Sequence, residues 1–226
     1  MSSQKRSLDE LLNHNDPGWP VVEKWIAQAI RSVDVLSPSV SGGPALVSMQ
    51  VTTRSPMGAV ILHTGGLLVD HGWIRILGSG HERLPRSLPE WNFACGMPES
   101  LEPPPWVLIA DDVLGGFFAL NGGWFGPPGH SVWYLAPDTL QWEDLGISYS
   151  QFLCWCLFGK LDKFYEVFRW PDWETEVSGI GGSQGLRIDP PLVMPGERID
   201  KRLRVRASIR DLFAQHVGSG LTTRPN

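Results

Sequence analysis

Short apolar runs separated by glycine and asparagine turns dominate the middle of the chain. Val107–Ile109 forms one run and Phe117–Leu120 a second, with Gly115–Gly116 between them and Asn121–Gly123 after them. Short apolar runs bounded by turn signals are typical of buried strands joined by tight turns. The pattern therefore predicts two strands at the centre of a sheet.

Three further apolar runs upstream are separated by short glycine turns: Met57–His63, Leu67–Asp70 and Trp73–Leu77. Consecutive strands with such turns are typical of an antiparallel meander. We assign the loosely alternating Ala45–Thr53 to the same sheet region, and Val132–Leu135 continues the sheet downstream. The segment Gly78–Pro105, rich in glycine, proline and charge, is expected to be a loop.

Helical signals flank these strands. Ser7 is placed to cap a first short helix, and Pro20 fits the first turn of a second. Ser148 and Gln151 have the spacing of a capping box before a third helix. Two more segments carry apolar residues at helical spacing, 161–168 and 209–217. Helices around antiparallel strands make the predicted fold α+β, a mainly antiparallel sheet flanked by helices.

The domain prediction follows from length and charge. The chain is long enough for one sizeable core, and we predict a single α+β domain over residues 7–195. Residues 196–226 form a basic C-terminal tail with a short helix; from 197 onward it holds seven bases and three acids, a balance of +4. Such a tail either docks on an acidic face of the same protein, stays unfolded, or contacts nucleic acid or another anionic surface. The acid excess elsewhere in the chain favours docking or an unfolded tail over contact with nucleic acid or another anionic surface.

The segment 98–180 has the opposite charge. It holds 12 acids and 3 bases, a balance of −9, and 17 of the 23 aromatic residues. Many of these aromatics are expected in the core, but aromatics interleaved with acids also suit a surface that binds a protein. The acid excess argues against nucleic acid as a partner of the main domain and favours a basic partner.

Cysteine use and hydropathy predict the compartment. Three cysteines, Cys95, Cys154 and Cys156, suit a reduced environment better than a disulfide framework. No apolar run approaches the roughly 20 residues that a bilayer-spanning helix needs, and no secretory signal core is visible. We therefore expect a cytoplasmic protein that is not bound to a membrane.

Two adjacent acids, Asp111 and Asp112, follow the first central run. On a strand their side chains point to opposite faces, so they can act as a carboxylate pair only if the strand ends between them. They are expected either to cap the turn at the strand end or to take part in binding or catalysis. Glu143 and Asp144 lie in a polar segment beside Trp142, where they are either solvated loop residues or a contact patch.

Motifs for metal, phosphate or nucleophile chemistry are missing from the sequence. No histidine pair has the H-x-x-x-H or H-E-x-x-H spacing of a zinc site, and Cys154 and Cys156 would point about 200° apart on a helix. The glycine-rich segments 78–80 and 179–185 lack the lysine of a P-loop, and no G-x-S-x-G elbow is present. We therefore expect no cofactor, no metal ion and no catalytic set.

The chain contains the long strings ADDVLGGFFALNGG, VWYLAPDTLQWEDLGISYSQFL and KFYEVFRWPDWE, preceded by LLNHNDPGWP and GGLLVDHGWIRILGSGH. Together they resemble a bacterial family known as a domain of unknown function, DUF2625. The resemblance covers roughly residues 7–195 and implies no established activity.

A looser resemblance rests on two shorter pieces. Asn121–Gly123 follows an apolar strand, and Ser148–Leu153 begins a helix of the Ser-x-x-x-Phe-Leu kind. Both features resemble those of the SUKH superfamily, which implies a SUKH-like fold. Many members of that superfamily are immunity proteins that bind and neutralise secreted toxins, so the resemblance implies such a role by analogy. The segment His81–Pro105 and the basic tail have no matching part.

The leading hypothesis is non-catalytic binding of another protein, one that is basic. Seven residues are the candidates for the contact face: Asp111, Asp112, Asn121, Trp124, Trp142, Glu143 and Asp144. The alternative is a small-ligand or hydrolytic enzyme that uses Asp111, Asp112 and either His71 or His81. Convergence of those side chains to within about 4 Å in one pocket would favour it. A third possibility is a housekeeping domain without a dedicated partner.

Overall fold

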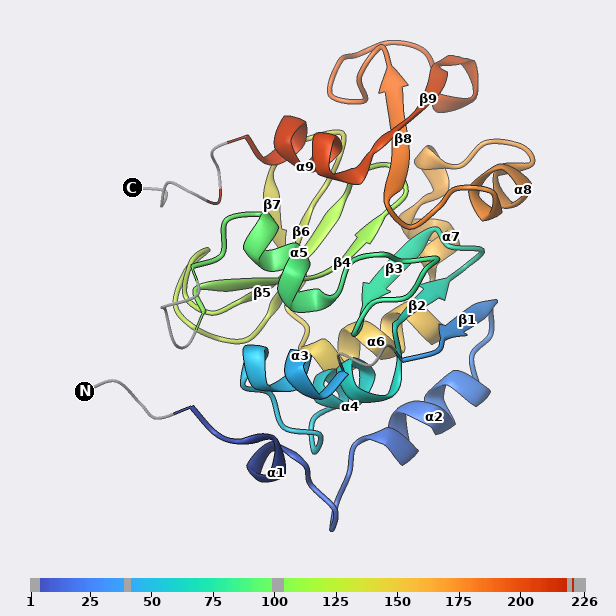
Figure 1. Cartoon of the computed structure of the whole chain (residues 1–226). Helices are drawn as coiled ribbons and strands as arrows, with labels where there is room; N and C mark the ends of the chain where they lie inside the picture. Colours follow the sequence, from blue (N-terminus) through green and yellow to red (C-terminus); the bar gives the residue numbers. More distant parts are fainter. Residues whose placement is uncertain (1–4, 39–41, 99–103, 219–220, 222–226) are drawn as a thin grey trace.

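The computed structural model describes residues 5–38, 42–98, 104–218 and 221. Within this part of the chain, the centre is a sheet of seven strands whose spatial order follows the sequence (Figure 1). The strands are β1 (Val33–Leu36), β2 (Gly66–Val69), β3 (Ile74–Leu77), β4 (Trp106–Asp112), β5 (Phe117–Asn121), β6 (Val132–Leu135) and β7 (Trp142–Asp144). Every neighbouring pair is antiparallel. The sheet is a meander, and the α+β prediction is confirmed.

Adjacent residues of β5 bury the two faces of the sheet. Phe117 meets Phe213 of α9 (Ile209–Val217) edge to face, with ring centroids 5.1 Å apart. Phe118 stacks on Tyr134 at 4.6 Å and contacts Phe152 of α6 (Tyr149–Phe158) at 4.9 Å. Since neighbouring side chains of a strand point to opposite faces, α9 covers one face of the sheet and α6 covers the other.

Four helices gather at one end of the molecule, in the lower part of Figure 1. They are α1 (Leu8–Leu11), α2 (Trp19–Ala27), α3 (Gly42–Met49) and α4 (Pro56–His63). The expected helix starts are confirmed: Ser7 caps α1 in a capping box, and Pro20 lies in the first turn of α2. Ser148 caps α6, with Gln151 as the second member of its box. Local capping signals therefore located these helices correctly.

The runs 45–53 and 57–63 were expected in the sheet, and this prediction is wrong. Residues 45–49 belong to α3 and residues 57–63 to α4, while β1 supplies the first strand of the meander. A short apolar run does not separate a buried strand from a buried helix. The missed signal is Ser55, whose Oγ accepts the Gly58 N–H at 3.1 Å, followed by Pro56 at the helix start.

The expected loop 78–105 contains a helix, α5 (Leu88–Ala94). Its start is a capping box in which Ser87 and Glu90 bond to each other. Asn92, fully buried, attaches this helix to the sheet: its side chain donates to the Leu108 carbonyl at 2.8 Å and accepts the Leu108 N–H at 2.7 Å. The pairing of β3 with β4 ends at Ala110, so Asn92 satisfies backbone groups that β3 does not reach.

The C-terminal segment is folded onto the rest of the chain. β8 (Gln184–Asp189) and β9 (Leu203–Ser208) form an antiparallel hairpin, which stands at the top of Figure 1. α9 follows and is the predicted short helix; its apolar side is buried: Ile209, Leu212, Phe213 and Val217. Since β9 pairs with β8, the expected boundary at 195–196 crosses one hairpin. The tail residues 219–220 and 222–226 lie outside the described part.

Two basic residues of this segment bind their own chain, as expected for self-docking. The Arg204 guanidinium lies 3.2 Å from the Glu176 carboxylate and over the ring of Trp170. Arg202 donates to the carbonyl groups of four residues: Pro190, Pro191, Met194 and Glu197. These contacts hold the segment that leads into β9.

The remaining short elements are α7 (Leu161–Phe164), α8 (Trp173–Ser178) and two 3₁₀ turns, η1 (Glu166–Phe168) and η2 (Ile199–Lys201). Among the helices of the described residues, none has the length and apolar content needed to cross a membrane.

Candidate functional site

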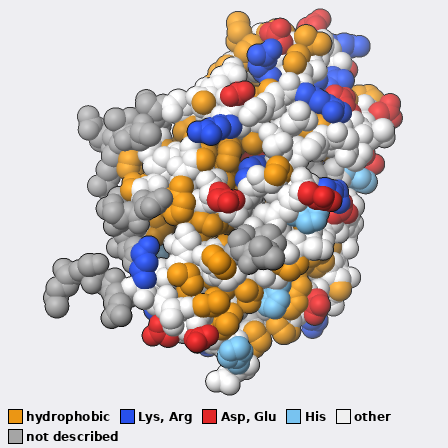
Figure 2. Space-filling model, in the orientation of Figure 1, with side chains coloured by type: hydrophobic (Ala, Val, Ile, Leu, Met, Phe, Trp, Pro, Cys, Tyr) orange, Lys and Arg blue, Asp and Glu red, His pale blue; other side chains and the backbone are white. Residues whose placement is uncertain are grey.

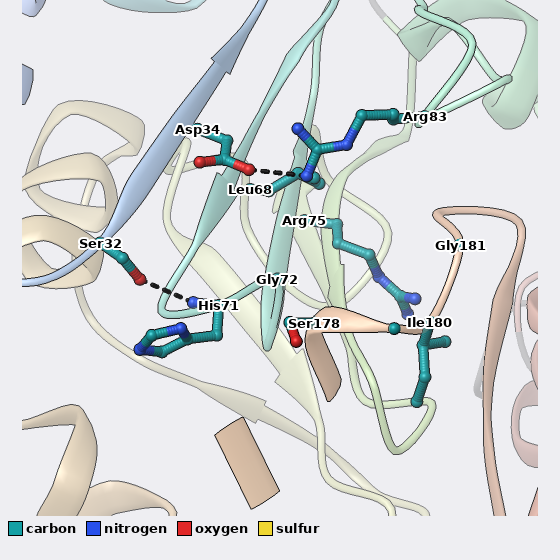
Figure 3. Close-up of a pocket in the computed structure, with 11 residues that line it drawn as sticks. Ser32, Asp34, Leu68, His71, Gly72, Arg75, Arg83, Ser178, Ile180 and Gly181 are labelled. Atoms are coloured by element: carbon teal, nitrogen blue, oxygen red, sulfur yellow. Dashed lines mark hydrogen bonds and ion pairs between the residues drawn. The ribbon is translucent and has the colours of Figure 1, made fainter. Parts of the chain in front are cut away.

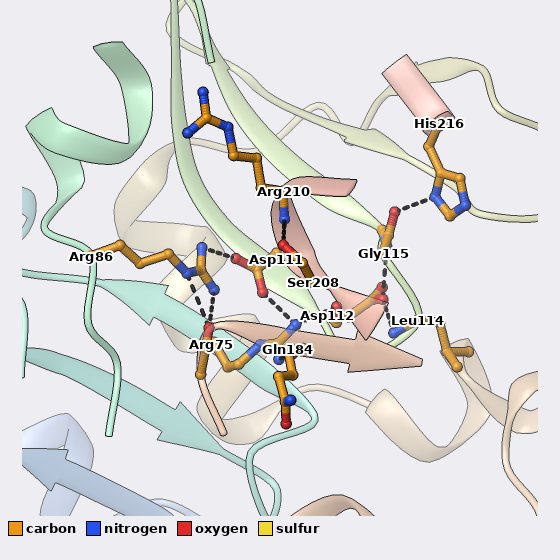
Figure 4. Close-up of polar contacts among 12 residues, drawn as sticks. Arg75, Arg86, Asp111, Asp112, Leu114, Gly115, Gln184, Ser208, Arg210 and His216 are labelled. Atoms are coloured by element: carbon orange, nitrogen blue, oxygen red, sulfur yellow. Dashed lines mark hydrogen bonds and ion pairs between the residues drawn. The ribbon is translucent and has the colours of Figure 1, made fainter. Parts of the chain in front are cut away.

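A buried charge network crosses the centre of the sheet (Figure 4). The Asp111 carboxylate contacts the guanidinium groups of Arg75 and Arg86 at 2.6 Å each, and its side chain has no exposed surface. Arg75 also donates to the carbonyl groups of Asp112 and Gln184. A salt bridge between two arginines and one carboxylate holds β3, β4 and the start of β8 together.

Asp112 faces the other side of β4. Its carboxylate accepts the backbone N–H groups of Leu114 and Gly116 at 2.9 Å and the hydroxyl groups of Tyr134 and Tyr165 at 2.7 and 3.2 Å. Burial raises the pKa of Asp112, while these bonds oppose part of the rise. Asp112 thus caps the turn after β4, which is the structural role that the sequence left open.

Neither acid lies on the surface, so the expectation that Asp111 or Asp112 lines a contact face is not met. Both side chains are fully buried and fully engaged with residues of the same chain. Both side chains are buried because β4 is covered on both faces of the sheet. Their opposite orientation, in contrast, was correctly predicted.

The residues of the enzyme hypothesis do not converge. His71 lies on the surface with its Nε2 atom 3.7 Å from Glu174, and the His81 ring accepts the backbone N–H of Arg83. His71 lines a cavity of about 300 Å³ together with Arg75 and Arg83 (Figure 3), and neither aspartate is part of its lining. Within the described residues no group of three histidine, cysteine or acidic side chains is placed to hold a metal ion.

The other candidate residues lie on β7, at the end of β5 and in the turn that follows β5. Asn121 is buried and its side-chain oxygen accepts the N–H groups of Gly123 and Phe125 at 2.8 and 3.2 Å, so it shapes the turn after β5. Trp142 is half-buried, and its ring lies 4.8 Å from that of Phe125. Asn121 thus positions this turn.

We call four half-buried side chains the aromatic edge: Trp124, Phe125, Trp133 and Trp142. Phe125 stacks on Trp133 at 5.0 Å, at an angle of 17° between the rings, so it lies between two tryptophans. Glu143 and Asp144 are exposed on β7, a strand rather than the expected loop. Asp144 lies opposite Trp133 and shares the face of the rings, whereas Glu143 lies opposite Tyr134 on the other face. Among the described strands β7 pairs only with β6, which makes it an edge of the sheet.

The comparisons with known proteins give one consistent result. A family model described as a protein of unknown function, DUF2625, matches residues 8–212. The chain belongs to this family. The DUF2625 match extends through β9 and into α9, which agrees with a C-terminal segment that is folded with the rest of the chain.

Two relatives of this DUF2625 chain cover almost its whole length. It is 41% identical over 211 residues to a putative uncharacterized protein, YbfG, of Escherichia coli, covering 92% of this chain and 94% of that protein. It is 38% identical over 206 residues to an uncharacterized protein of Haemophilus influenzae, covering 90% of each. No solved structure matches the chain.

The sequence interpretation missed Arg75 and Arg86 as partners of Asp111. A signal was present for Arg75: it interrupts the apolar run Trp73–Leu77, and a charge inside a buried strand needs an opposite charge nearby. In the observed register Arg75 lies directly opposite Asp111 on the neighbouring strand. Phe125 and Trp133 were also missed, since the pairing of β6 with β7 places Trp133 and the turn after β5 places Phe125.

Proposed function

We propose that this chain is a non-catalytic protein-binding domain whose contact face is the aromatic edge with Asp144, while Glu143 flanks it on the other side of β7. The observation that carries the proposal is the combination of half-buried rings and exposed acids on an edge strand. Large aromatic side chains supply most of the energy at protein interfaces, while exposed charges mainly raise the association rate.

The partner in this proposal is a basic protein. The segment 98–180, which contains the aromatic edge, has a balance of −9, so its field attracts positive charge. The SUKH resemblance suggests a particular form of this function, namely neutralisation of a basic toxin in the cytoplasm. Glu143 and Asp144 would then occupy the place of substrate phosphates in a nuclease cleft.

A pull-down with the full chain as bait tests the proposal. Lysate of the native host is applied at low and at moderate salt, and bound proteins are identified by mass spectrometry. We expect one basic protein, with less recovered at moderate salt because exposed charge pairs are screened. Trp142→Ala is expected to weaken its binding about 30-fold, corresponding to about 2 kcal/mol for an interface tryptophan.

Charge-reversal variants locate the face. Asp144→Lys is expected to slow association at low salt, because Asp144 is exposed on β7 and shares the face of Trp133. Glu166→Lys is the matched control: it makes the same change in net charge at an exposed residue of η1. Equal binding by Trp142→Ala and wild type, or equal slowing by both charge reversals, would show that the aromatic edge is not the contact face.

A further inference from the structure

A second surface feature lies between α5 and the start of α9. The face shown in Figure 2 is hollowed near its centre, where Figure 1 places these two helices. The cavity has a volume of about 390 Å³. We call this cavity the arginine pocket. The polar and aromatic residues that line it are Arg86, Glu90, Trp91, Ser183, Ser208 and Arg210.

The charges around the arginine pocket are unbalanced. Arg86 and Arg75 share the single carboxylate of Asp111, and both arginines are buried. Arg210 is exposed, and no acid of the described residues forms an ion pair with it. Glu90, the acid in the lining, already accepts hydrogen bonds from Ser87 in the capping box of α5. The pocket therefore has more positive than negative charge at its wall.

Two lining residues have hydrogen-bond donors without an acceptor among the described residues. Arg86 donates three hydrogen bonds, two to the Gly182 carbonyl and one to Asp111, which leaves two of the five N–H groups of a guanidinium. The Trp91 side chain packs under Arg86, and its buried indole N–H has no acceptor among the described residues. Donors that are buried without acceptors are uncommon in folded proteins.

The start of α9 adds a third positive element. Ser208 caps this helix by accepting the Arg210 N–H at 3.2 Å, so the positive end of the helix dipole meets the pocket where Ser208 and Arg210 line it (Figure 4). Arg86 and Arg210 line the same cavity, so one ligand bound there can contact both side chains.

We propose that the arginine pocket binds the phosphate group of a small molecule. A phosphate dianion can accept several charge-assisted hydrogen bonds at once, and arginine is suited to bind it with two parallel bonds. Arg86 supplies a buried donor, and Arg210 supplies an exposed donor at the same cavity. The remaining cavity is large enough for the rest of a small ligand. The inference is independent of the protein-binding proposal, which concerns the aromatic edge.

Inorganic phosphate is the probe for a first test with the full chain. The melting temperature is followed as phosphate is added, with sodium chloride at equal ionic strength as the reference and acetate as a singly charged carboxylate. We expect a saturable rise with phosphate, a smaller rise with acetate and none with chloride. A binding site that is specific to the folded state raises stability in this concentration-dependent way.

Two substitutions of Arg210 and one control substitution test whether phosphate stabilises the protein by binding in the arginine pocket. Arg210→Gln is expected to raise the half-saturating phosphate concentration at least tenfold, and Arg210→Lys, which keeps the charge, by less. Arg187→Gln is the matched control, because Arg187 is exposed on β8 and lines a separate cavity beside the other end of α9. Without phosphate, Arg210→Gln and wild type should melt alike, since Arg210 is exposed.

Two results would overturn the proposal. One is a melting temperature that rises no more with phosphate than with sodium chloride. The other is an equal loss of phosphate binding in Arg210→Gln and Arg187→Gln, which would indicate general attraction to positive charge instead of a site. Neither result bears on the aromatic edge, so the two proposals fail separately.

Discussion

The carboxylates of Asp111 and Asp112 belong to neighbouring residues of β4 and lie on opposite faces of the sheet. Asp111 is held by two arginine side chains, Arg75 and Arg86. Asp112 is held by two tyrosine hydroxyl groups and two backbone N–H groups. A sequence pair that looks like a catalytic dyad is therefore two separate structural acids. Replacement of each by asparagine should change the stability of the protein in a different way.

Replacement of Asp111 by asparagine should be strongly destabilising. The exchange leaves Arg75 and Arg86 buried without their shared negative charge, and breaking a buried pair in this way typically costs about 3–5 kcal/mol. Urea unfolding measures the loss. Glu143→Gln, at an exposed position, is the control and should change stability by less than about 0.5 kcal/mol. A loss below about 1 kcal/mol for Asp111→Asn would contradict the role assigned to the network.

Asp112→Asn should instead alter the pH dependence of stability. Burial raises the pKa of Asp112 above the value of about 3.9 in the unfolded chain, so the folded state binds this proton more tightly. The tighter binding of this proton stabilises the folded state fully at pH values below the unfolded pKa of Asp112. This stabilisation is lost as the pH rises through the folded pKa.

The asparagine variant lacks this titration while its amide can still bond to the turn and to the tyrosine hydroxyls. The stability of wild type relative to Asp112→Asn should therefore fall as pH rises from 4 towards neutrality. Urea unfolding at several pH values checks the trend. A relative stability that rises over this range would show that the folded pKa of Asp112 is lowered.

The sequence predicted the fold well where a local signal and the final environment agree. Ser7, Pro20 and the pair Ser148 and Gln151 act through backbone groups within a few residues, so their helices were placed correctly. α4 was missed because its run is almost wholly apolar and carries no helical period, although Ser55 before it was an available cap.

The candidate site was only partly predictable, because its geometry depends on strand register. Trp142, Glu143 and Asp144 are consecutive in the chain, so the sequence alone places them close together. Their neighbours Phe125 and Trp133 come from other segments, and they are brought close by the turn after β5 and by the pairing of β6 with β7. The assignment of Asp111 to a surface failed for the related reason that covering of both sheet faces is a tertiary property.

The three cysteine side chains should have similar charge states but differ clearly in their exposure to an alkylating reagent. Burial raises the pKa of Cys95 to about 12 and also raises the pKa values of Cys154 and Cys156. Since the thiolate is the reactive form, all three should alkylate slowly at pH 8 in the folded protein. Cys154 is half-exposed and should react first. Mass spectrometry after timed treatment with iodoacetamide gives the order, and prior reaction of Cys156 would contradict the packing of α6.

Asn92 should be the residue that holds α5 on the sheet. Asn92→Ala leaves the N–H and C=O groups of Leu108 without their side-chain partner, at the irregularity of β4 between Leu108 and Ala110. Each buried backbone group left without a partner costs about 1–3 kcal/mol, so we expect a loss of at least about 2 kcal/mol in urea unfolding.

Hydrogen exchange tests the role of Asn92 more directly than the unfolding free energy does. In native-state hydrogen exchange of Asn92→Ala, the Leu108 amide should lose protection, whereas the Phe118 amide on β5 should keep protection in proportion to the remaining stability. Ser87→Ala is the matched control, because it weakens the start of the same helix without touching Leu108. If Ser87→Ala exposed the Leu108 amide as much as Asn92→Ala does, the protection would come from α5 as a whole and the role of the Asn92 side chain would be refuted.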